Sequence, residues 1–191
     1  VSTQSTGNIM SDQIDGGKLI LVGAAASGKT SLMLRIINGV FREDVATSLS
    51  AAYVQHELGH GSKRVMFRMW DTAGQERFRS MTPSYFRGAD VVLLCFDLTS
   101  QDSYDQLSHW FSTSKQICPA AAVYVVGCKS DLQPKNLQKA AALEEIKQIN
   151  LSAKTGEGID ALIQELVQNG SSRQNLQPTI QLKEVKKQGC C

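Results

Sequence analysis

The stretch GAAASGKT, residues 23–30, fits the phosphate-loop pattern G-x-x-x-x-G-K-[ST]. It lies between KLILVG (18–23), an apolar run that predicts a strand, and SLMLRIING (31–39), which predicts a helix. In such a loop, successive backbone N–H groups and the positive end of the helix dipole attract phosphate. A chance glycine-rich turn is the alternative, but the strand–loop–helix context argues against it. We predict a phosphate site formed by Ala24, Ala25, Ala26, Ser27, Gly28, Lys29, Thr30 and Ser31, in which Lys29 supplies a charge and Thr30 a hydroxyl for Mg²⁺.

A second motif, WDTAGQERF (70–78), follows a predicted strand. Asp71 at the strand end can hold Mg²⁺ through water, Gly74 can offer its backbone N–H to a γ-phosphate, and Gln75 can orient an attacking water. A surface loop with a capping Asp is the alternative. The phosphate loop upstream favours the interpretation as a nucleotide site.

Short apolar runs alternate with helical patterns along the rest of the chain. Strands are predicted at 18–23, 51–58, 63–70, 91–98, 121–127 and 146–151, and helices at 31–39, 102–117, near 135–145 and at 158–168. The turn Gly59-His60-Gly61-Ser62 should join the second and third strands into a hairpin. The alternation implies an α/β fold with a six-stranded, mostly parallel sheet and helices on both faces. Such sheets bind ligands at the carboxyl ends of their strands.

Composition and charge are those of one soluble globular domain: 191 residues, 42% hydrophobic, formal charge +2. The charge gives no argument for nucleic acid, and no apolar run approaches the roughly 20 residues of a membrane-spanning helix. We predict a flexible leader over 1–16, a domain over 17–169 and a disordered polar tail over 170–191. No signal peptide or disulfide framework is expected. Cys95 and Cys118 lie in or beside apolar runs, as reduced core thiols of a cytosolic protein would.

Together these motifs make the chain resemble a small Ras-like GTPase, and within that class the Rab family. The stretches FRMW (67–70), RFRSMT (77–82), YFRGAD (85–90) and FDLT (96–99) carry the Rab character. LSAAY (49–53) most resembles the early-endosomal branch. The resemblance implies a P-loop NTPase small G domain that binds GTP with Mg²⁺ and hydrolyses it slowly to GDP. It further implies a switch that recruits effectors to membranes in vesicle trafficking.

The resemblance also implies further nucleotide contacts. Phe41 falls where the family places an aromatic ring that stacks on guanine, a core Phe being the alternative. Ser48 falls at the family's Thr, which binds Mg²⁺ through its hydroxyl and the γ-phosphate through its backbone N–H. Ser152, Ala153 and Lys154 match the loop that contacts guanine, with the Ala153 N–H facing the base carbonyl.

The stretch GCKSD (127–131) departs from the family's Asn-Lys-x-Asp, because Cys128 stands where the family has Asn. Asp131 can accept from both the ring N–H and the exocyclic amine of guanine, and Lys129 would lie along the base and sugar. The Asn amide normally donates to the purine and ties the base loop to the phosphate loop. A thiol is a weak donor and acceptor, so we expect faster nucleotide exchange. Simple tolerance of Cys128 by repacking is the alternative.

Two further departures surround the site. Ala25 stands where Ras-like proteins often have Gly or Ser, and its methyl approaches the space that Gln75 shares with an arginine from a partner. Slower hydrolysis would follow if this crowding matters, and neutral variation is the alternative. The span from Asp131 to Ser152 is short for the family, so the helix between them is expected to be truncated.

The tail ends in KEVKKQGCC (183–191). Terminal cysteine pairs are doubly geranylgeranylated in Rab proteins, and two chains anchor stably where one is marginal. Nearby lysines add attraction to anionic lipid. We therefore predict lipidation of Cys190 and Cys191, with an unmodified polar tail as the alternative.

The resulting interpretation is a monomeric Rab-like switch on the cytosolic face of an intracellular trafficking membrane, cycling with the cytosol and binding no nucleic acid. Expected partners are guanine nucleotide, effectors, an exchange factor, a GTPase-activating protein, a prenylation escort and a GDP-dissociation inhibitor. A degenerate, fast-exchanging or hydrolysis-deficient membrane scaffold is one alternative, favoured by Cys128 and Ala25. An ATP-using P-loop kinase is another, opposed by DTAGQ and Asp131. The predicted effector surface includes Phe67, Trp70, Phe78 and Tyr85.

Overall fold

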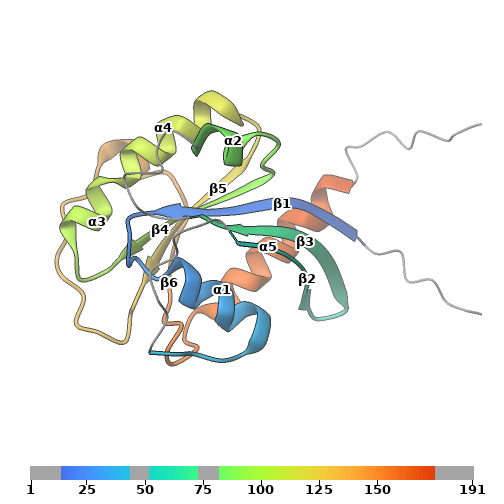
Figure 1. The fold of residues 1–191 in the computed structure, drawn as a ribbon, viewed down its shortest axis with the longest axis horizontal. Coiled ribbons are helices and arrows are strands. Elements are labelled where there is room, and N and C mark those ends of the chain that lie inside the picture. The colour runs from blue at the N-terminus through green and yellow to red at the C-terminus, as the bar shows by residue number, and fades with distance from the viewer. Residues whose placement is uncertain (1–13, 44–51, 73–81, 175–191) are drawn as a thin grey trace, which may run out of the picture.

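A computed structural model describes residues 14–43, 52–72 and 82–174 of the chain (Figure 1). Its centre is a six-stranded sheet in the order β2-β3-β1-β4-β5-β6. Strand β2 is antiparallel to β3, and the other neighbouring strands pair in parallel. Helices α1 and α5 cover one face, and α2, α3 and α4 cover the other. The predicted α/β fold with helices on both faces is therefore confirmed.

The strands are β1 (Ile14–Gly23), β2 (Ala52–His60), β3 (Lys63–Asp71), β4 (Val91–Asp97), β5 (Ala122–Cys128) and β6 (Gln148–Asn150). The helices are α1 (Lys29–Asn38), α2 (Thr82–Phe86), α3 (Gln101–Asp105), α4 (Leu107–Ile117) and α5 (Ile159–Gln174), with one 3₁₀ turn, η2 (Ala141–Leu143).

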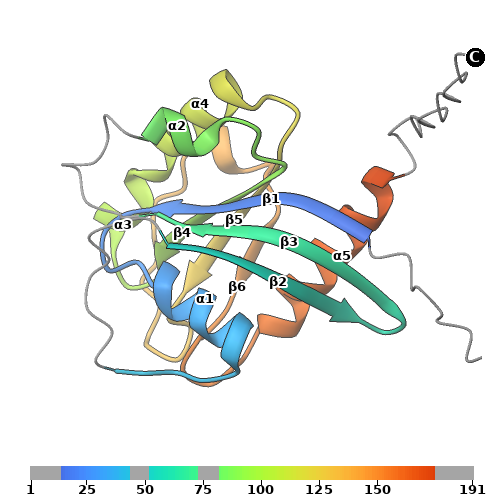
Figure 2. The same ribbon diagram turned by 45° about the vertical axis from the view of Figure 1, so that its right-hand side comes forward.

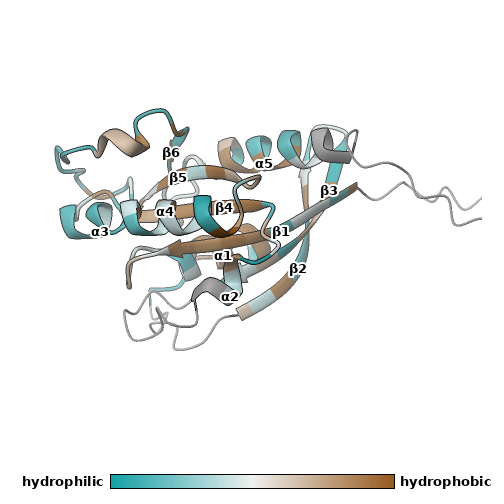
Figure 3. Cartoon of the chain, turned by 90° about the horizontal axis from the view of Figure 1, so that it is seen from above, coloured by the Kyte–Doolittle hydropathy of each residue, from teal (hydrophilic) through white to brown (hydrophobic). Residues whose placement is uncertain are grey.

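Two apolar layers hold the sheet between its helices. Strand β4 is buried from Val91 to Phe96, because helices pack on both of its faces. Figure 3 shows these central strands as the hydrophobic middle of the molecule. On one face, side chains of α1 and α5 pack together against the sheet: Leu32, Met33, Ile36, Ile159, Leu162 and Leu166. On the other face the layer includes Phe86, Tyr104, Leu107 and Trp110.

The hairpin between β2 and β3 forms as predicted, with His60 paired to Lys63 beside the turn. Strand β1, by contrast, begins at Ile14, four residues before the strand predicted from residue 18. Its register shifts between Asp15 and Gly17, and Gly17 has a φ of 85°. The two glycines here obscure the strand pattern in the sequence, although Ile14 pairs with Val65 on β3. Residues 14–16 therefore belong to the sheet rather than to the predicted leader.

Helix α5 is also longer than predicted, because it continues to Gln174, into the stretch predicted as a tail. Figure 2 shows it running along β1, β2 and β3. Gly170 allows this close approach: a Cβ there would lie 2.8 Å from Val65 Cγ1 and 3.3 Å from Gly16 Cα. Packing against the early part of β1 therefore supports a helical turn that polar sequence alone does not predict. No helix among the described residues is long and apolar enough to cross a bilayer.

The prediction of a helix near residues 135–145 is wrong, since only the 3₁₀ turn η2 forms there. Leu143 is buried, while Leu137, Ala140 and Ile146 are half-buried against the same layer. These apolar positions are spaced three residues apart, which does not build the continuous stripe of an α-helix. The prediction that the helix in this span is truncated agrees with this. The predicted helix 102–117 is present but divided at Gln106 into α3 and α4.

Cys95 and Cys118 are buried and free of disulfide bonds, as predicted for reduced core thiols.

Candidate nucleotide-binding site

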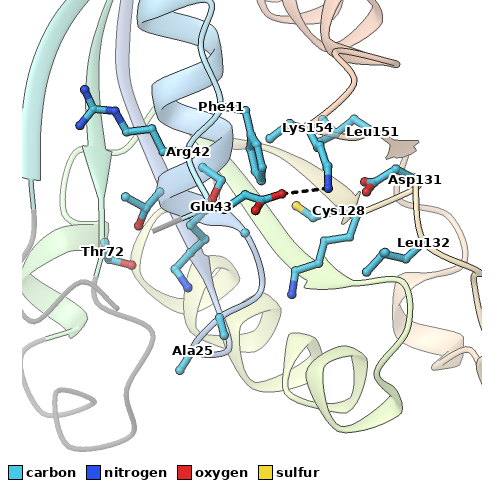
Figure 4. A pocket seen from close by; sticks show the side chains of 17 residues that line it. Ala25, Phe41, Arg42, Glu43, Thr72, Cys128, Asp131, Leu132, Leu151 and Lys154 are labelled. Carbon is cyan, nitrogen blue, oxygen red and sulfur yellow. Dashed lines mark hydrogen bonds and ion pairs between the residues drawn. The ribbon is translucent and has the colours of Figure 1, made fainter. Parts of the chain in front are cut away.

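A cavity of about 330 Å³ lies where β1, β3, β5 and β6 end, at the carboxyl edge of the sheet. This is where ligands bind in open parallel sheets. Figure 4 shows Asp131 and Lys154 at one end of it and Thr72 and Ala25 at the other. The lining residues are Ala25, Ala26, Gly28, Lys29, Thr30, Ser31, Phe41, Arg42, Glu43, Thr72, Cys128, Lys129, Asp131, Leu132, Leu151, Ala153 and Lys154.

The phosphate loop joins β1 to α1 through unusual backbone conformations. Ala26 has a φ of 57° and Gly28 a φ of 105°, both in the left-handed region. Ala26 tolerates this conformation at a cost of order 1–3 kcal/mol, of the kind that clusters at functional sites. Alternation of such conformations turns successive N–H groups toward one side and creates a concave site for anions. Helix α1 then begins at Lys29, so the positive end of its dipole faces the same space.

Lys29 is only 5% exposed, yet it keeps a hydrogen-bonded ammonium group. Its Nζ donates to the carbonyls of Gly23 at 3.0 Å and Ala24 at 2.7 Å, and to Ser27 Oγ at 3.4 Å. Burial lowers the pKa of Lys29 from its ordinary value, and nearby groups including the Asp71 carboxylate oppose this shift. The loop thus holds a desolvated positive charge at the floor of the cavity.

Thr30 and Asp71 place two oxygen groups together beside this lysine. Thr30 Oγ1 donates to Asp71 Oδ2 at 2.7 Å, and the Asp71 side chain is almost completely buried. A hydroxyl and a carboxylate are the hard oxygen donors that Mg²⁺ prefers, particularly next to substrate phosphates. The two residues therefore fit the magnesium site predicted for them.

Asp131 and Ser152 form the polar end of the cavity. Ser152 Oγ donates to Asp131 Oδ1 at 2.6 Å and accepts from the backbone N–H groups of Lys154 and Thr155, both at 3.1 Å. Ser152 is completely buried, so it supports the loop from beneath rather than lining the cavity. This bond fixes one oxygen of the Asp131 carboxylate, which lines the cavity.

Cys128 lies between the two ends of the cavity, with its side chain almost completely buried (Figure 4). Its thiol donates to the carbonyl of Val126 on its own strand, at 3.9 Å. A Cβ on Gly28 would lie 3.1 Å from Cys128 Cβ and 3.5 Å from Cys128 Sγ. The thiol therefore meets the phosphate loop by close packing, where the family's Asn would use its amide.

Lys129 is held in place by an acidic partner. Its Nζ lies 2.7 Å from Asp97 Oδ2, and Asp97 also accepts from the N–H and hydroxyl of Thr99. Burial alone would raise the pKa of Asp97, but hydrogen bonds from Lys129 and Thr99 lower it below its ordinary value. Lys129 has a left-handed φ of 65°, which directs its side chain along the cavity wall.

Phe41 lies on the cavity wall rather than in either core layer, which argues against its alternative role as a core Phe. Two residues further on, Glu43 pairs with Lys154 at 3.0 Å (Figure 4). This pair raises the pKa of Lys154. It links the segment after α1 to the loop after β6.

The structure brings most of the predicted site residues to one cavity. Ala24, Ser27, Asp71 and Ser152 are buried behind its lining. Ser48, Gly74, Gln75, Cys190 and Cys191 lie outside the described residues. The sequence did not indicate Arg42, Glu43, Thr72, Leu132 or Leu151. Thr72 and Glu43 closely follow motif residues and could have been suspected from that position.

An aromatic group lies on a separate surface. The ring of Trp70 is 4.9 Å from Tyr53 and 6.3 Å from Tyr85, between centroids. Tyr53 is 52% exposed. Phe67, predicted to belong to this surface, is instead completely buried in the core, because β3 alternates and Phe67 faces opposite to Trp70. Phe78 lies outside the described residues.

Comparison of the chain with known proteins shows the family to which it belongs. The family model described as "Ras family" matches residues 18–171. The chain is 34% identical to the Ras-related protein Rab-18 of Caenorhabditis briggsae, over 86% of this chain and 87% of that protein. It is 31% identical to Rab-24 of Dictyostelium discoideum, over 91% of this chain and 96% of that protein. It is also 31% identical to Rab-5A of the same organism, over 91% and 94%.

A phosphate-loop sequence between a strand and a helix, at the carboxyl edge of a mostly parallel sheet, is the arrangement of a P-loop nucleotide-binding domain. The chain belongs to the Ras family of small GTPases. Its relatives place it in the Rab group, whose members are GTPases that act in vesicle trafficking. Relatives with several different Rab numbers match at nearly equal identity, so they do not favour the early-endosomal branch over others.

Proposed function

We propose that this cavity holds GTP or GDP, with the phosphates on the loop before α1 and the guanine between the loops after β5 and β6. The observation that carries the proposal is the continuity of the cavity. Lys29 and Thr30 line one end of the same space that Asp131 and Ala153 line at the other.

At the phosphate end, the backbone N–H groups around Ala26 and Gly28 would bind the outer phosphates together with Lys29. The present partners of Lys29 are loop carbonyls and a hydroxyl, so the ammonium would need no rearrangement of the helix to lie beneath the phosphates. Thr30 and Asp71 would hold Mg²⁺. The cation, when bound, neutralises phosphate charge during transfer to water.

At the guanine end, Asp131 would accept hydrogen bonds from the ring N–H and the exocyclic amine. Ala153 would donate its backbone N–H to the base carbonyl, and Phe41 would stack on the ring. Adenine lacks this combination of donors and acceptor, so the arrangement selects guanine. A charge-assisted hydrogen bond of this kind contributes about 1.5–3 kcal/mol.

Hydrolysis would use Gln75 to orient the attacking water, with Ser48 and Gly74 contacting the γ-phosphate and its cation. We expect slow intrinsic hydrolysis and acceleration by a partner that supplies an arginine. Ala25 lines the phosphate end of the cavity. If its methyl group crowds the space that Gln75 needs, hydrolysis would be slower, and neutral variation is the alternative.

The aromatic group of Tyr53, Trp70 and Tyr85 is the proposed effector surface. Half-exposed aromatic side chains supply large contact area at interfaces. Lipidation of Cys190 and Cys191 would hold the switch at an intracellular membrane, where effectors, an exchange factor and a GTPase-activating protein would act on it.

A degenerate, fast-exchanging scaffold remains the second proposed function, and Cys128 is the observation that favours it. Nucleotide content separates the two. We expect the purified protein to contain GDP or GTP rather than ATP, and to hydrolyse GTP in single-turnover measurements. Protein that contains no guanine nucleotide and binds none when GDP and Mg²⁺ are added would contradict the switch. Protein that binds GTP but never hydrolyses it would support the scaffold.

Replacement of Cys128 by Asn should slow GDP release about five- to thirtyfold, because one or two neutral hydrogen bonds of roughly 1 kcal/mol each are restored. Release of a fluorescent GDP analogue, chased with unlabelled GDP, measures this. Cys118→Asn is the matched control, because Cys118 packs on the opposite face of the sheet. Equal release rates for wild type and Cys128→Asn would show that the thiol is simply tolerated by repacking.

A further inference from the structure

Arg35, in the last turn of α1, connects the helix to the loop after β6. Its Nε donates to the carbonyl of Ala153 and its Nη2 to the carbonyl of Lys154, both at 2.6 Å. Its Nη1 donates to the carbonyl of Gly39, also at 2.6 Å. One guanidinium therefore joins the end of α1 to a loop 118 residues further along the chain.

A role in helix capping does not account for these contacts. A cation in the last turn of a helix stabilises its C-terminus, and the bond to Gly39 provides that effect. The other two donors, Nε and Nη2, bind two consecutive carbonyls of the loop after β6. Such a forked contact suits the rigid, planar donors of Arg, whereas Lys offers a single flexible point charge.

We propose that Arg35 is a positioning residue for the guanine base. By binding the Ala153–Lys154 loop, Arg35 holds the Ala153 N–H where it can donate to the base carbonyl. This inference rests on the proposed function of the cavity. The peptide group after Ala153 is fixed at both ends: Arg35 binds its carbonyl, and Ser152 Oγ accepts its N–H at 3.1 Å. Ser152 Oγ also donates to Asp131, so both guanine-reading groups share one hydrogen-bonded network with Arg35.

The position of Arg35 on α1 gives this network a second consequence. The phosphate loop leads into α1 at Lys29, and Arg35 lies six residues later on the same helix. A rigid helix thus joins the phosphate end of the cavity to the base end. Cys128 lies close to Gly28 of the phosphate loop, and its thiol donates to the carbonyl of Val126 on its own strand. Arg35 therefore makes a polar connection between the two ends that the Asn amide makes elsewhere in the family.

The neighbouring ion pair between Glu43 and Lys154 adds to the same connection (Figure 4). Both side chains are exposed, and exposed pairs contribute little to stability. The three hydrogen bonds of the half-buried Arg35 therefore dominate, and Arg35 is the residue to test.

Arg35→Met keeps a long side chain on α1 but removes all three donors. GDP should leave this variant about five- to thirtyfold faster than it leaves wild type, as measured with the fluorescent GDP analogue. Arg35→Lys, which can reach only one carbonyl at a time, should release GDP at an intermediate rate. Arg64→Met is the matched control, because Arg64 donates to the carbonyls of Gly61 and Lys63 in the hairpin turn, far from the cavity. Its release rate should equal that of wild type.

The preference for GDP over ADP distinguishes a role of Arg35 in positioning the base from a general loosening of the fold in the variant. ADP has an amine where guanine has its carbonyl, so it does not use the Ala153 N–H. The ratio of GDP to ADP affinity, from competition against the fluorescent analogue, should fall by about the same factor as release accelerates. Equal weakening of GDP and ADP, or unchanged GDP release in Arg35→Met, would overturn the inference. Wild-type protein that binds no guanine nucleotide would instead overturn the proposed function beneath it.

Discussion

Replacing Lys29 with Met should lower the affinity for GDP and GTP by about 30- to 5,000-fold, which corresponds to about 2–5 kcal/mol for losing one partner of a buried charge pair. Lys29 is almost completely buried beneath the phosphate loop, where its ammonium is desolvated. A charge in such surroundings attracts phosphate more strongly than a charge in water does. Met fills nearly the same volume, so the substitution removes the charge with little change in packing. Titration with fluorescent GDP measures the effect.

The matched control for this variant is Lys18→Met. Lys18 also donates to a backbone carbonyl, that of Arg87, and lies 5.2 Å from the ring of Trp70, away from the cavity. Its removal should leave GDP affinity unchanged. Circular dichroism of both variants verifies that the sheet and helices persist. If folded Lys29→Met kept wild-type affinity within about threefold, which is less than 1 kcal/mol, the lysine would not be a phosphate ligand.

The phosphate loop could be predicted from sequence because its chemistry is local. Eight consecutive residues specify the turn, the charge and the helix start, and the structure places them between β1 and α1 as predicted. The positions of the strands, and their mostly parallel arrangement, followed from the alternation of apolar runs with helical patterns. These features depend on contacts between residues that are close in the chain.

The ends of β1 and α5 could not be predicted in this way, because each depends on the other. Gly16 and Gly170 are far apart in the sequence, and their close approach lets α5 cross β1. In the sequence, each glycine interrupts the apolar pattern that would otherwise predict its own strand or helix. Only the tertiary contact between them explains why the strand starts early and the helix ends late.

The wrong prediction that Phe67 belongs to the effector surface could have been avoided from the sequence. Residues 67 and 70 are an odd number of positions apart on a strand, so their side chains must face opposite sides of the sheet. Trp70 is on the opposite face of the sheet from Phe67, partly buried beside Tyr53, its partner in register on β2. Arg35 was missed for a different reason, since no sequence motif indicates a contact across 118 residues.

The second large effect concerns the choice of base. Replacing Asp131 with Asn should lower GDP affinity by about 100-fold or more, because two charge-assisted hydrogen bonds of about 1.5–3 kcal/mol each are lost. The hydroxyl of Ser152 donates to Asp131 at 2.6 Å, so it would hold the amide oxygen of Asn on its own side. The amide NH₂ would then face the base. Guanine presents N–H groups there, so the amide NH₂ of Asn would face other hydrogen-bond donors and no hydrogen bond could form.

Xanthine carries a carbonyl at the position of the guanine amine, so the same amide can donate to it. Asp131→Asn should therefore bind xanthosine diphosphate better than wild type does, while GDP binding falls. Competition of both nucleotides against a fluorescent analogue measures the exchange of preference. Asp105→Asn is the matched control, because Asp105 is an exposed residue of α3 outside the cavity lining. A uniform loss of both nucleotides in Asp131→Asn would mean that Asp131 supports the loop without reading the base. A reversed preference requires that its carboxylate face the purine edge, because no effect on folding alone favours xanthine over guanine.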